Sequence, residues 1–384
     1  MKRTIFTIIA ALLAASCVYE FEPEGVVTQK RLVIEGDIIV GGTTKVIVSC
    51  TMPLRYDEDY DYSVPSGTAW VEAQDGSIFT AKRTVTSGSQ LQFTIDTRDA
   101  QNNTRYRLHF MENGSSREYI SSWQEVIPAP EIKGMSFDFD DSKVYLRVSA
   151  DGKDTAYFKW DYVEDWEFHA EYAPLFMFDV ENGQCIQLDE YDYSTYYCWN
   201  HHESSQSGLV STAAQSMNVM DGQLVESYER KNIRFQYLYR MDLTMTGLSS
   251  DAYEYLHNMR EISNVTGSLF APSPDDMRGN IKCQQDTTEF VIGYISALQP
   301  VTERFYIKEG ENAFYKAPAP TPIVAPELEK DQTLTDYYYA GHRPVFEEYE
   351  GISAVIKWGP TRCVDCTKLG GYKTRPHDWP NNHE

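Results

Sequence analysis

Short runs in which apolar and polar residues alternate fill the first third of this 384-residue chain, and they constrain its fold more than any other feature. Alternation repeats every two residues, which is the side-chain period of a β-strand with one buried face. Clusters of Gly, Asn, Asp or Ser separate seven such runs: RLVIEGDIIV, TKVIVSC, TAWVEAQ, SIFTAKR, LQFTIDT, RYRLHFME and REYISSW. We therefore expect a mainly β protein in which residues 30–125 form an immunoglobulin-like β-sandwich.

The proline-bearing segment QEVIPAPEIKG, at 124–134, is the expected end of this sandwich. Strand-like runs continue beyond it as IRFQYLYRMDLTMT, EFVIGYISA and ISAVIKW, so residues 131–384 predict a second β-rich domain. Two domains also suit the length, because one hydrophobic core rarely serves more than about 250–300 residues. Asp-Gly pairs accept the positive φ angles of tight turns, and they predict hairpins at Asp75-Gly76 and Asp151-Gly152.

One short amphipathic helix is expected in the second domain, at residues 251–263. Apolar residues recur there at helical spacing: Ala252, Tyr255, Leu256, Met259 and Ile262. Asp251 and Glu254 have the spacing of a capping box at the start of this helix. We interpret the apolar stripe as core packing, with a groove for a partner as the alternative. Prolines between residues 316 and 330 indicate an extended connector.

Residues 1–16 are typical of a secretory signal peptide. Lys2 and Arg3 precede an apolar run that is too short to span a bilayer, and small residues follow it. The segment LAASC, residues 13–17, resembles the lipobox of bacterial lipoproteins, which implies cleavage before Cys17 and a diacylglycerol on its sulfur. An ordinary signal peptide with an incidental cysteine is the alternative. Since stable anchoring needs at least two acyl chains, a lipid-modified Cys17 would hold the protein on a membrane.

An acidic tether, residues 17–29, follows and contains Glu20, Glu22 and Glu24. Acidic residues soon after a lipidated cysteine resemble the surface-export signal of Bacteroidota lipoproteins, which implies a lipid-anchored, outward-facing protein of the outer membrane. A solvated tether without a targeting role is the alternative. The formal net charge of −23 argues against nucleic-acid binding and against electrostatic adhesion to anionic lipid, because both need a basic surface.

Six cysteines remain after Cys17: Cys50, Cys185, Cys198, Cys283, Cys363 and Cys366. An even number in an exported chain favours disulfides, although six cysteines allow fifteen pairings. Zinc binding is a second interpretation, because Cys363 and Cys366 have ligand spacing and two histidines follow Cys198 closely. Structural zinc sites usually have two such pairs, however, and only one is present. Free thiols are the third interpretation. We favour disulfides and predict no metal site.

Motifs for catalysis are missing from the sequence. It contains no Gly-x-Ser-x-Gly elbow, phosphate-binding loop or dinucleotide fingerprint, so we predict no catalytic residues and no cofactor. The segment DEDYDYS, residues 57–63, alternates carboxylates as a calcium loop does. Tyr62 stands where that loop needs glycine, and Thr68 where it needs glutamate. A solvated acidic loop is therefore preferred to adventitious calcium binding.

Tyrosine is abundant, at 27 residues, and it concentrates with acidic residues in three segments: YDEDYDYS, LDEYDYSTYYCW and TDYYYAGHRP. Such rings can stack on a sugar, hold a peptide or form a protein interface, since tyrosine adds contact area at low entropy cost. Outward positions on strands are the alternative explanation. The candidate binding-surface residues are Tyr60, Tyr62, Tyr191, Tyr193, Tyr196, Tyr337 and Tyr338.

An ordered series of segments between residues 25 and 380 resembles one family. The segments are RLVIEGDI, RFQYLYRMDLTMTGLSSDAYEYLHNMREIS, TGSLFAPSPDDMRGNIKC, FVIGYISA and WGPTRCVDCTKLGGYKTRPHDW. They are similar to exported Bacteroidota lipoproteins of the family called domain of unknown function 4249. The resemblance implies a bridge from Cys198 to Cys363 or Cys366. It also implies turn and packing roles for Gly267, Phe270, Gly279, Asn280, Ile281, Gly293 and Tyr294.

The same resemblance implies a function without catalytic residues. Family members look like accessory lipoproteins of outer-membrane transport, often encoded beside TonB-dependent receptors. We therefore expect a non-enzymatic lipoprotein that assists a TonB-dependent β-barrel in capturing a glycan, peptide or other nutrient. The expected contact surface is formed by the loops near Tyr60, Tyr193 and Tyr338. A structural lipoprotein in adhesion or envelope biogenesis is the alternative, and a hydrolase acting on a glycan or peptide is a third.

Overall fold

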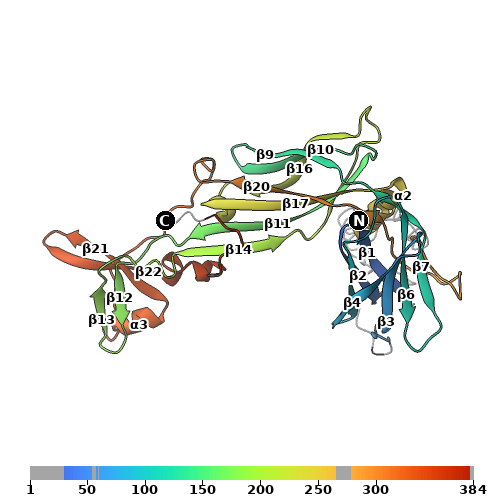
Figure 1. Ribbon diagram of the computed structural model, residues 1–384. Helices are drawn as coiled ribbons and strands as arrows, with labels where there is room; N and C mark the ends of the chain where they lie inside the picture. The colour runs from blue at the N-terminus through green and yellow to red at the C-terminus, as the bar shows by residue number, and fades with distance from the viewer. Residues whose placement is uncertain (1–29, 54–57, 59, 265–277, 381–384) are drawn as a thin grey trace, which may run out of the picture.

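The computed structural model describes residues 30–53, 58, 60–264 and 278–380 of the chain. They form a mainly β protein, as the alternating sequence predicts. Three parts follow one another along an elongated molecule: an N-terminal barrel at one end, a central sandwich, and a distal module at the other end (Figure 1). No helix among the described residues is long and apolar enough to cross a membrane. The predicted signal peptide, Cys17 and the acidic tether lie outside the described residues.

Eight strands of the barrel form a closed sheet in the order β6-β3-β4-β5-β2-β1-β19-β8, and β8 pairs again with β6. Their bounds are β1 (Leu32–Ile39), β2 (Gly42–Cys50), β3 (Gly67–Ala73), β4 (Ile78–Ser87), β5 (Gln90–Thr97), β6 (Arg105–Glu112), β8 (Gln124–Ile127) and β19 (Ala297–Leu298). The start of β6 pairs with β8, whereas its later residues pair with β7 (Glu118–Ser121), and β18 (Ile281–Cys283) follows β7. A closed ring removes the free edges of a sheet.

This closed sheet differs from the predicted immunoglobulin-like sandwich, which has two separate sheets. The sheet closes through β19, which pairs in parallel with β1 on one side and with β8 on the other. Both β18 and β19 come from residues 281–298, inside the range that the sequence assigns to the second domain. A two-residue strand has no alternating pattern, so the sequence does not reveal this closure.

Alternation places the apolar side chains of the barrel strands inside. Ile34, Val48, Phe93 and Ile95 are among those that have no exposed surface. The predicted hairpin at Asp75-Gly76 is confirmed, because β3 and β4 pair on either side of it. Gly76 has a φ of +93°, and the Asp75 carboxylate accepts a hydrogen bond from the Ser77 N–H at 2.8 Å.

The central sandwich has two sheets that share one hydrophobic core. One sheet contains β9 (Glu131–Phe139), β10 (Lys143–Asp151) and β16 (Val219–Glu229). The other contains β14 (Tyr197–Glu203), β11 (Tyr157–His169), β17 (Leu238–Gly247) and β20 (Val301–Ile307), with β15 (Gly208–Ser211) beside β11. The predicted hairpin at Asp151-Gly152 is wrong, because β10 and β11 belong to different sheets. Residues 152–156 carry the chain from one sheet to the other.

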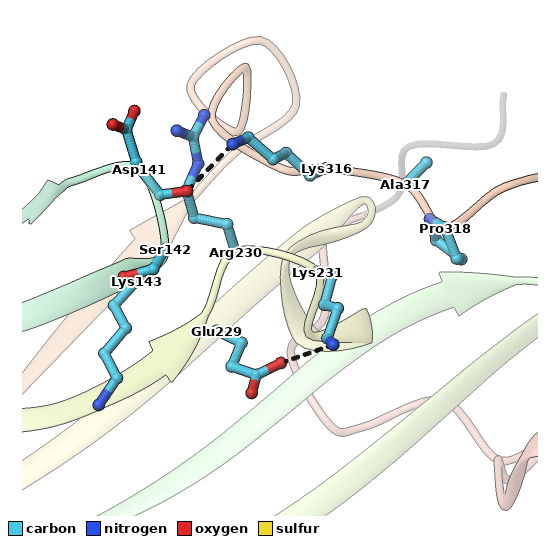
Figure 2. Close-up of a pocket in the computed structure, with 9 residues that line it drawn as sticks. All are labelled: Asp141, Ser142, Lys143, Glu229, Arg230, Lys231, Lys316, Ala317 and Pro318. Atoms are coloured by element: carbon cyan, nitrogen blue, oxygen red, sulfur yellow. Dashed lines mark hydrogen bonds and ion pairs between the residues drawn. The ribbon is translucent and has the colours of Figure 1, made fainter.

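The turn between β9 and β10 is tied to a distant segment of the chain. The Lys316 ammonium donates to the Asp141 carbonyl at 3.0 Å (Figure 2). The Arg230 guanidinium, just after β16, donates to the carbonyls of Asp140 and Phe314 at 3.0 and 2.7 Å. The 3₁₀ turn η1 (Ile233–Phe235) follows. These bonds fix residues 314–318 beside the end of β16.

Helix α2 (Ser250–Asn264) confirms the predicted helix. Its cap differs from the prediction, because the Ser249 hydroxyl accepts a hydrogen bond from the Ala252 N–H at 3.2 Å. Ala252 is buried in a small core with Leu248 and with Leu298 of the barrel strand β19. Leu256 packs against the same core, so the interpretation of the apolar stripe as core packing is confirmed for these two residues of the helix.

The distal module contains two small sheets and one short helix. The elements are β12 (Phe176–Asp179) with β13 (Gln184–Gln187), β21 (His342–Glu350) with β22 (Ser353–Pro360), and α3 (Leu334–Tyr339). The sequence does not predict α3, which Thr333 and Asp336 cap reciprocally. Within the proline-rich connector, Val324 exchanges two backbone hydrogen bonds with Trp358. Two 3₁₀ turns, η3 (Thr361–Cys363) and η4 (Cys366–Leu369), follow β22.

Candidate functional site

A group of aromatic side chains gathers where β11 ends and β14 begins. The ring centroid of Tyr193 lies 5.4 Å from that of Tyr196, 5.7 Å from Tyr197 and 6.5 Å from Tyr191. The His169 ring lies 5.0 Å from Tyr196 and 4.8 Å from Tyr197. Tyr191 and Tyr193 expose about half of their surface, 53% and 49%. We name these five residues the Tyr193 cluster.

The chemistry of this cluster suits binding. Burial raises the pKa of Tyr196 and of Tyr197, so both phenols stay protonated at neutral pH and can donate hydrogen bonds. Ring faces add apolar contact area and stack on flat or apolar surfaces. A cluster of this kind can therefore contact a glycan, a peptide or a folded protein.

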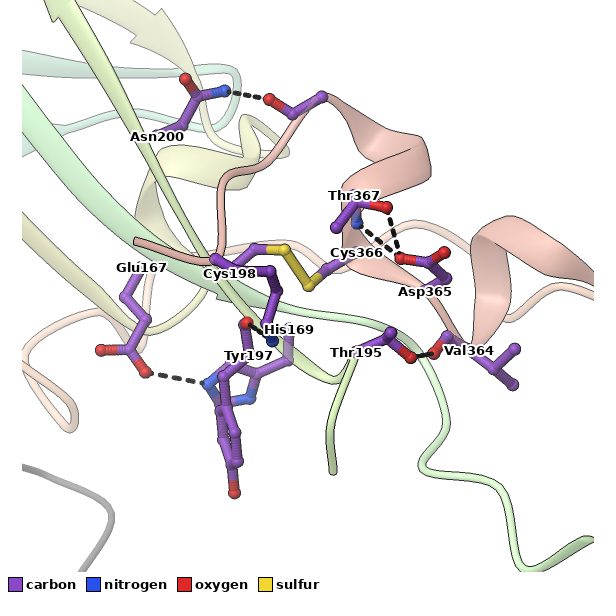
Figure 3. The surroundings of a disulfide bond; sticks show 12 residues. Glu167, His169, Thr195, Tyr197, Cys198, Asn200, Val364, Asp365, Cys366 and Thr367 are labelled. Carbon is purple, nitrogen blue, oxygen red and sulfur yellow. Dashed lines mark hydrogen bonds and ion pairs between the residues drawn. A yellow bond between two sulfur atoms is a disulfide. The ribbon is translucent and has the colours of Figure 1, made fainter. Parts of the chain in front are cut away.

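A disulfide fixes the strand that carries the cluster. Cys198, the residue after Tyr197, is bonded to Cys366 of η4, with 5.8 Å between their Cα atoms (Figure 3). Two hydrogen bonds join the same segments: the Cys366 N–H donates to the Thr195 carbonyl at 2.9 Å, and the Thr195 hydroxyl donates to the Val364 carbonyl at 2.9 Å. The tyrosines on both sides of Thr195 are therefore held against η4.

The glycine pair after η4 allows this close approach. Gly370 ends η4 with a φ of +87°, a conformation that favours glycine. A Cβ atom on Gly371 would lie 2.5 Å from the Cβ of Cys198 and 2.6 Å from the Phe168 ring. Only glycine fits at position 371 without a shift of these neighbours.

Carboxylates of β11 lie in the interior next to the cluster. Glu164 and Glu167 have no exposed surface, and Asp165 is 5% exposed. Glu167 lies 3.4 Å from the His169 ring (Figure 3) and accepts a hydrogen bond from the Trp379 indole at 2.7 Å. It therefore links the cluster to the C-terminal segment.

Glu164 has the most partners. Its carboxylate accepts hydrogen bonds from the hydroxyls of Tyr228, at 2.7 Å, and Tyr239, and it lies 3.1 Å from His202 Nδ1 and 3.5 Å from Arg234 Nε. Burial, together with the Glu164 charge, raises the pKa of Tyr228 and Tyr239, so both remain donors. These hydrogen bonds compensate the burial of the Glu164 charge, and the bond to Tyr228 of β16 joins the two sheets of the central sandwich.

The comparisons with known proteins give one family. A family model described as "Domain of unknown function (DUF4249)" matches residues 18–304. This chain belongs to the DUF4249 family. The matched range includes the Tyr193 cluster and Cys198, whereas Cys366 lies beyond it. No curated protein matches the sequence.

Among solved structures, a DUF4785 family protein from Legionella pneumophila is similar to this DUF4249 chain with 12% sequence identity and a TM-score of 0.20. The similarity covers 55% of this chain and 51% of that protein. The DUF4249 chain thus spans about half the length of that protein.

The cysteines of the DUF4249 chain are only partly paired. Of the two bridges that the resemblance implies, the structure has Cys198–Cys366. The expectation of further disulfides is wrong for the other four, which are free thiols: Cys50, Cys185, Cys283 and Cys363. They lie on β2, β13, β18 and η3, which are not neighbouring strands of one sheet. Burial raises the pKa of Cys185 to about 11, which keeps it a thiol at neutral pH.

The candidate zinc ligands of the DUF4249 chain have other partners in the structure. Cys366 is in the disulfide, and His201 Nδ1 lies 2.9 Å from a carboxylate oxygen of Asp165. His202 faces Glu164. In the described part of the chain, no group of three or more His, Cys, Asp or Glu side chains is placed to hold a metal ion.

The predicted binding tyrosines do not form one surface. Tyr60 and Tyr62 contact each other at 5.0 Å beside the barrel, outside the Tyr193 cluster. Tyr337 stacks on His342 at 4.0 Å, and Tyr338 lies 5.2 Å from Phe178, so these two rings pack within the distal module. The strongly exposed tyrosine of α3 is Tyr339, at 72%, which is not among the predicted binding residues. Tyr191, Tyr193 and Tyr196 alone form a shared site.

The family-motif residues pack as the resemblance implies. The Asn280 side chain exchanges two hydrogen bonds with the Ile295 backbone, at 2.8 and 2.9 Å, and Ile281 is buried. Gly279 and Gly293 approach each other too closely for a side chain. Gly267 and Phe270 lie outside the described residues.

The interior carboxylates of β11 were not predicted from the sequence. The run YFKWDYVEDWEFH contains a signal that could have predicted them, because Glu164 occupies an inward position of this strand between Tyr162 and Trp166. A charged residue at an inward position of an aromatic strand indicates a buried, paired carboxylate. The residues that satisfy it, Tyr228 and Tyr239, come from other strands.

Proposed function

We propose that this chain is a non-enzymatic lipoprotein of the outer membrane, anchored through Cys17 and facing outward, that assists a TonB-dependent transporter in nutrient capture. The amino-terminal sequence supports the anchor, and the family resemblance supports the transport role. The lipid raises the effective concentration of the protein beside its transporter, so contact does not require strong intrinsic affinity.

One observation carries the proposed contact. The rings of Tyr191 and Tyr193 are half exposed, and the adjacent Cys198–Cys366 disulfide restrains the segment that carries them. A surface that is ordered before binding loses less entropy on association. Tyrosine is also enriched in protein interfaces. The Tyr193 cluster is therefore the proposed contact for the extracellular surface of a β-barrel receptor.

Affinity capture from outer membranes tests this contact. The wild-type protein is expected to retain a TonB-dependent β-barrel, and the Tyr191→Ala/Tyr193→Ala variant to lose most of it. Tyr349→Ala is the matched control, since Tyr349 is 72% exposed but lies on β21, away from the cluster. Equal capture by all three proteins would exclude the cluster, and the absence of a β-barrel from wild-type captures would exclude the function.

Deletion of the gene distinguishes the alternative role. A growth defect confined to one nutrient supports transport. Altered attachment or envelope integrity, with normal growth on every nutrient, supports a structural lipoprotein instead.

A further inference from the structure

A recess of about 420 Å³ lies at the edge of the central sandwich, away from the Tyr193 cluster. It forms where the turn between β9 and β10, the residues after β16, and residues 316–318 come together (Figure 2). Sites for small organic ligands have volumes of roughly 300–1,000 Å³. The recess is therefore large enough for a ligand.

Basic side chains surround this recess in an otherwise acidic protein. Four cations line it, Lys143, Arg230, Lys231 and Lys316, against the two carboxylates of Asp141 and Glu229. The whole chain, in contrast, has 34 Lys and Arg for 57 Asp and Glu. The lining thus has an excess of two positive charges, the opposite of the molecule as a whole.

Most of this charge is not neutralised. Lys231 lies 3.1 Å from Glu229 (Figure 2), but both side chains are more than 60% exposed, so water screens this pair strongly. Among the described residues, no carboxylate lies within ion-pair distance of Lys143, Arg230 or Lys316. The three cations therefore remain available to an anion.

The structure also orients two of the cations. Backbone carbonyls accept hydrogen bonds from Nε and Nη1 of Arg230, and the guanidinium lies 4.9 Å from the Phe139 ring. Nη2 has no hydrogen-bond partner among the described residues. Lys316 is held by the Asp141 carbonyl. The nearby Asp140 carboxylate is not part of the lining, and hydrogen bonds from the Ser142 and Lys143 N–H groups hold it within its own turn.

We propose that this recess binds the phosphate group of an organic ligand. The Arg230 guanidinium and the neighbouring Lys316 ammonium (Figure 2) are a donor set of the kind that phosphate recognition uses, and the net positive charge of the lining suits the anionic phosphate of a monoester or a diester. Ala317 and Pro318 supply an apolar wall for the organic part of the ligand. The phosphate can belong to a soluble molecule or to the head group of a lipid. This inference does not depend on the proposed role in transport.

Calorimetric titration of the purified Cys17→Ala protein, which lacks the lipid site, tests the inference. Two probes are used: inorganic phosphate, and vesicles of phosphatidylglycerol compared with phosphatidylcholine. The Cys17→Ala protein, in which the recess is unaltered, is expected to bind at least one of the two phosphate-bearing probes. Binding of free phosphate indicates a soluble ligand, and selective binding of phosphatidylglycerol vesicles indicates a lipid head group.

Charge substitutions then locate the binding. Lys143→Gln/Lys316→Gln removes two exposed recess cations that no carboxylate of the described residues pairs with, and it is expected to weaken binding at least tenfold. Lys308→Gln/Lys330→Gln removes two lysines outside the recess and is expected to leave binding unchanged. Equal affinity in both variants would mean adventitious ion binding only and would overturn the proposal, as would the failure of both probes to bind.

Discussion

At the scale of single residues, Glu164 shows how a charge is accommodated inside a β-sandwich. It has no exposed surface and contacts Tyr228, Tyr239, His202 and Arg234. We predict that Glu164→Ala destabilises the protein by about 3–5 kcal/mol, because it leaves a guanidinium without its opposite charge and two hydroxyls without their acceptor. Urea unfolding at pH 7 measures the loss. Glu164→Gln keeps one acceptor oxygen and should cost less.

Glu303→Ala is the control for this experiment. Glu303 is an exposed carboxylate on β20, in the same sheet as Glu164. Its removal is expected to change the free energy of unfolding by less than about 0.5 kcal/mol. Similar small effects for both alanine variants would mean that Glu164 does not hold the two sheets together.

At the scale of elements, the disulfide joins β14 to η4 across 168 residues of sequence. Cys363 and Cys366 are three residues apart, yet only Cys366 is bonded to Cys198. We predict that Cys366→Ser abolishes the bridge and lowers the free energy of unfolding by about 2–5 kcal/mol, because cross-linking a long loop restricts the unfolded chain. Peptide mapping without reductant, combined with urea unfolding, measures both effects.

Cys363→Ser is the matched control for this bridge. It removes a free thiol from the same short segment and is expected to keep the Cys198–Cys366 peptide. A wild-type map that contains Cys198 joined to Cys363 would contradict the structure. The distinction matters because the family resemblance implied a bridge from Cys198 to either cysteine.

The local sequence pattern predicted where most strands lie but not which strands pair with one another. Alternation identified β1 to β6 of the barrel and β7 beside it, and Asp75-Gly76 identified a true hairpin, since both features act between neighbours in sequence. The Asp151-Gly152 hairpin failed because β10 and β11 find their partners in opposite sheets. The barrel closes through β19, and Tyr193 is fixed through Cys366, both of which come from far along the chain.

At the scale of the whole molecule, the order of the parts determines what an amino-terminal anchor would hold. The described chain begins at Lys30, next to β1 of the barrel, whereas the distal module occupies the opposite end (Figure 1). A lipid on Cys17 would therefore attach the protein through its barrel. The Tyr193 cluster, on the central sandwich, would remain free to meet a neighbouring protein.

We predict that Cys17→Ala moves the protein from the outer-membrane fraction to the soluble fraction. No element of the described fold contains Cys17, so the circular dichroism spectrum and unfolding midpoint should not change. Cys185→Ala, which removes a free thiol from β13, should stay with the membrane. Because tethering raises the local concentration, the soluble variant should also lose receptor occupancy in cells while binding the purified receptor normally. Full retention of Cys17→Ala in the outer membrane would rule out anchoring by this lipid.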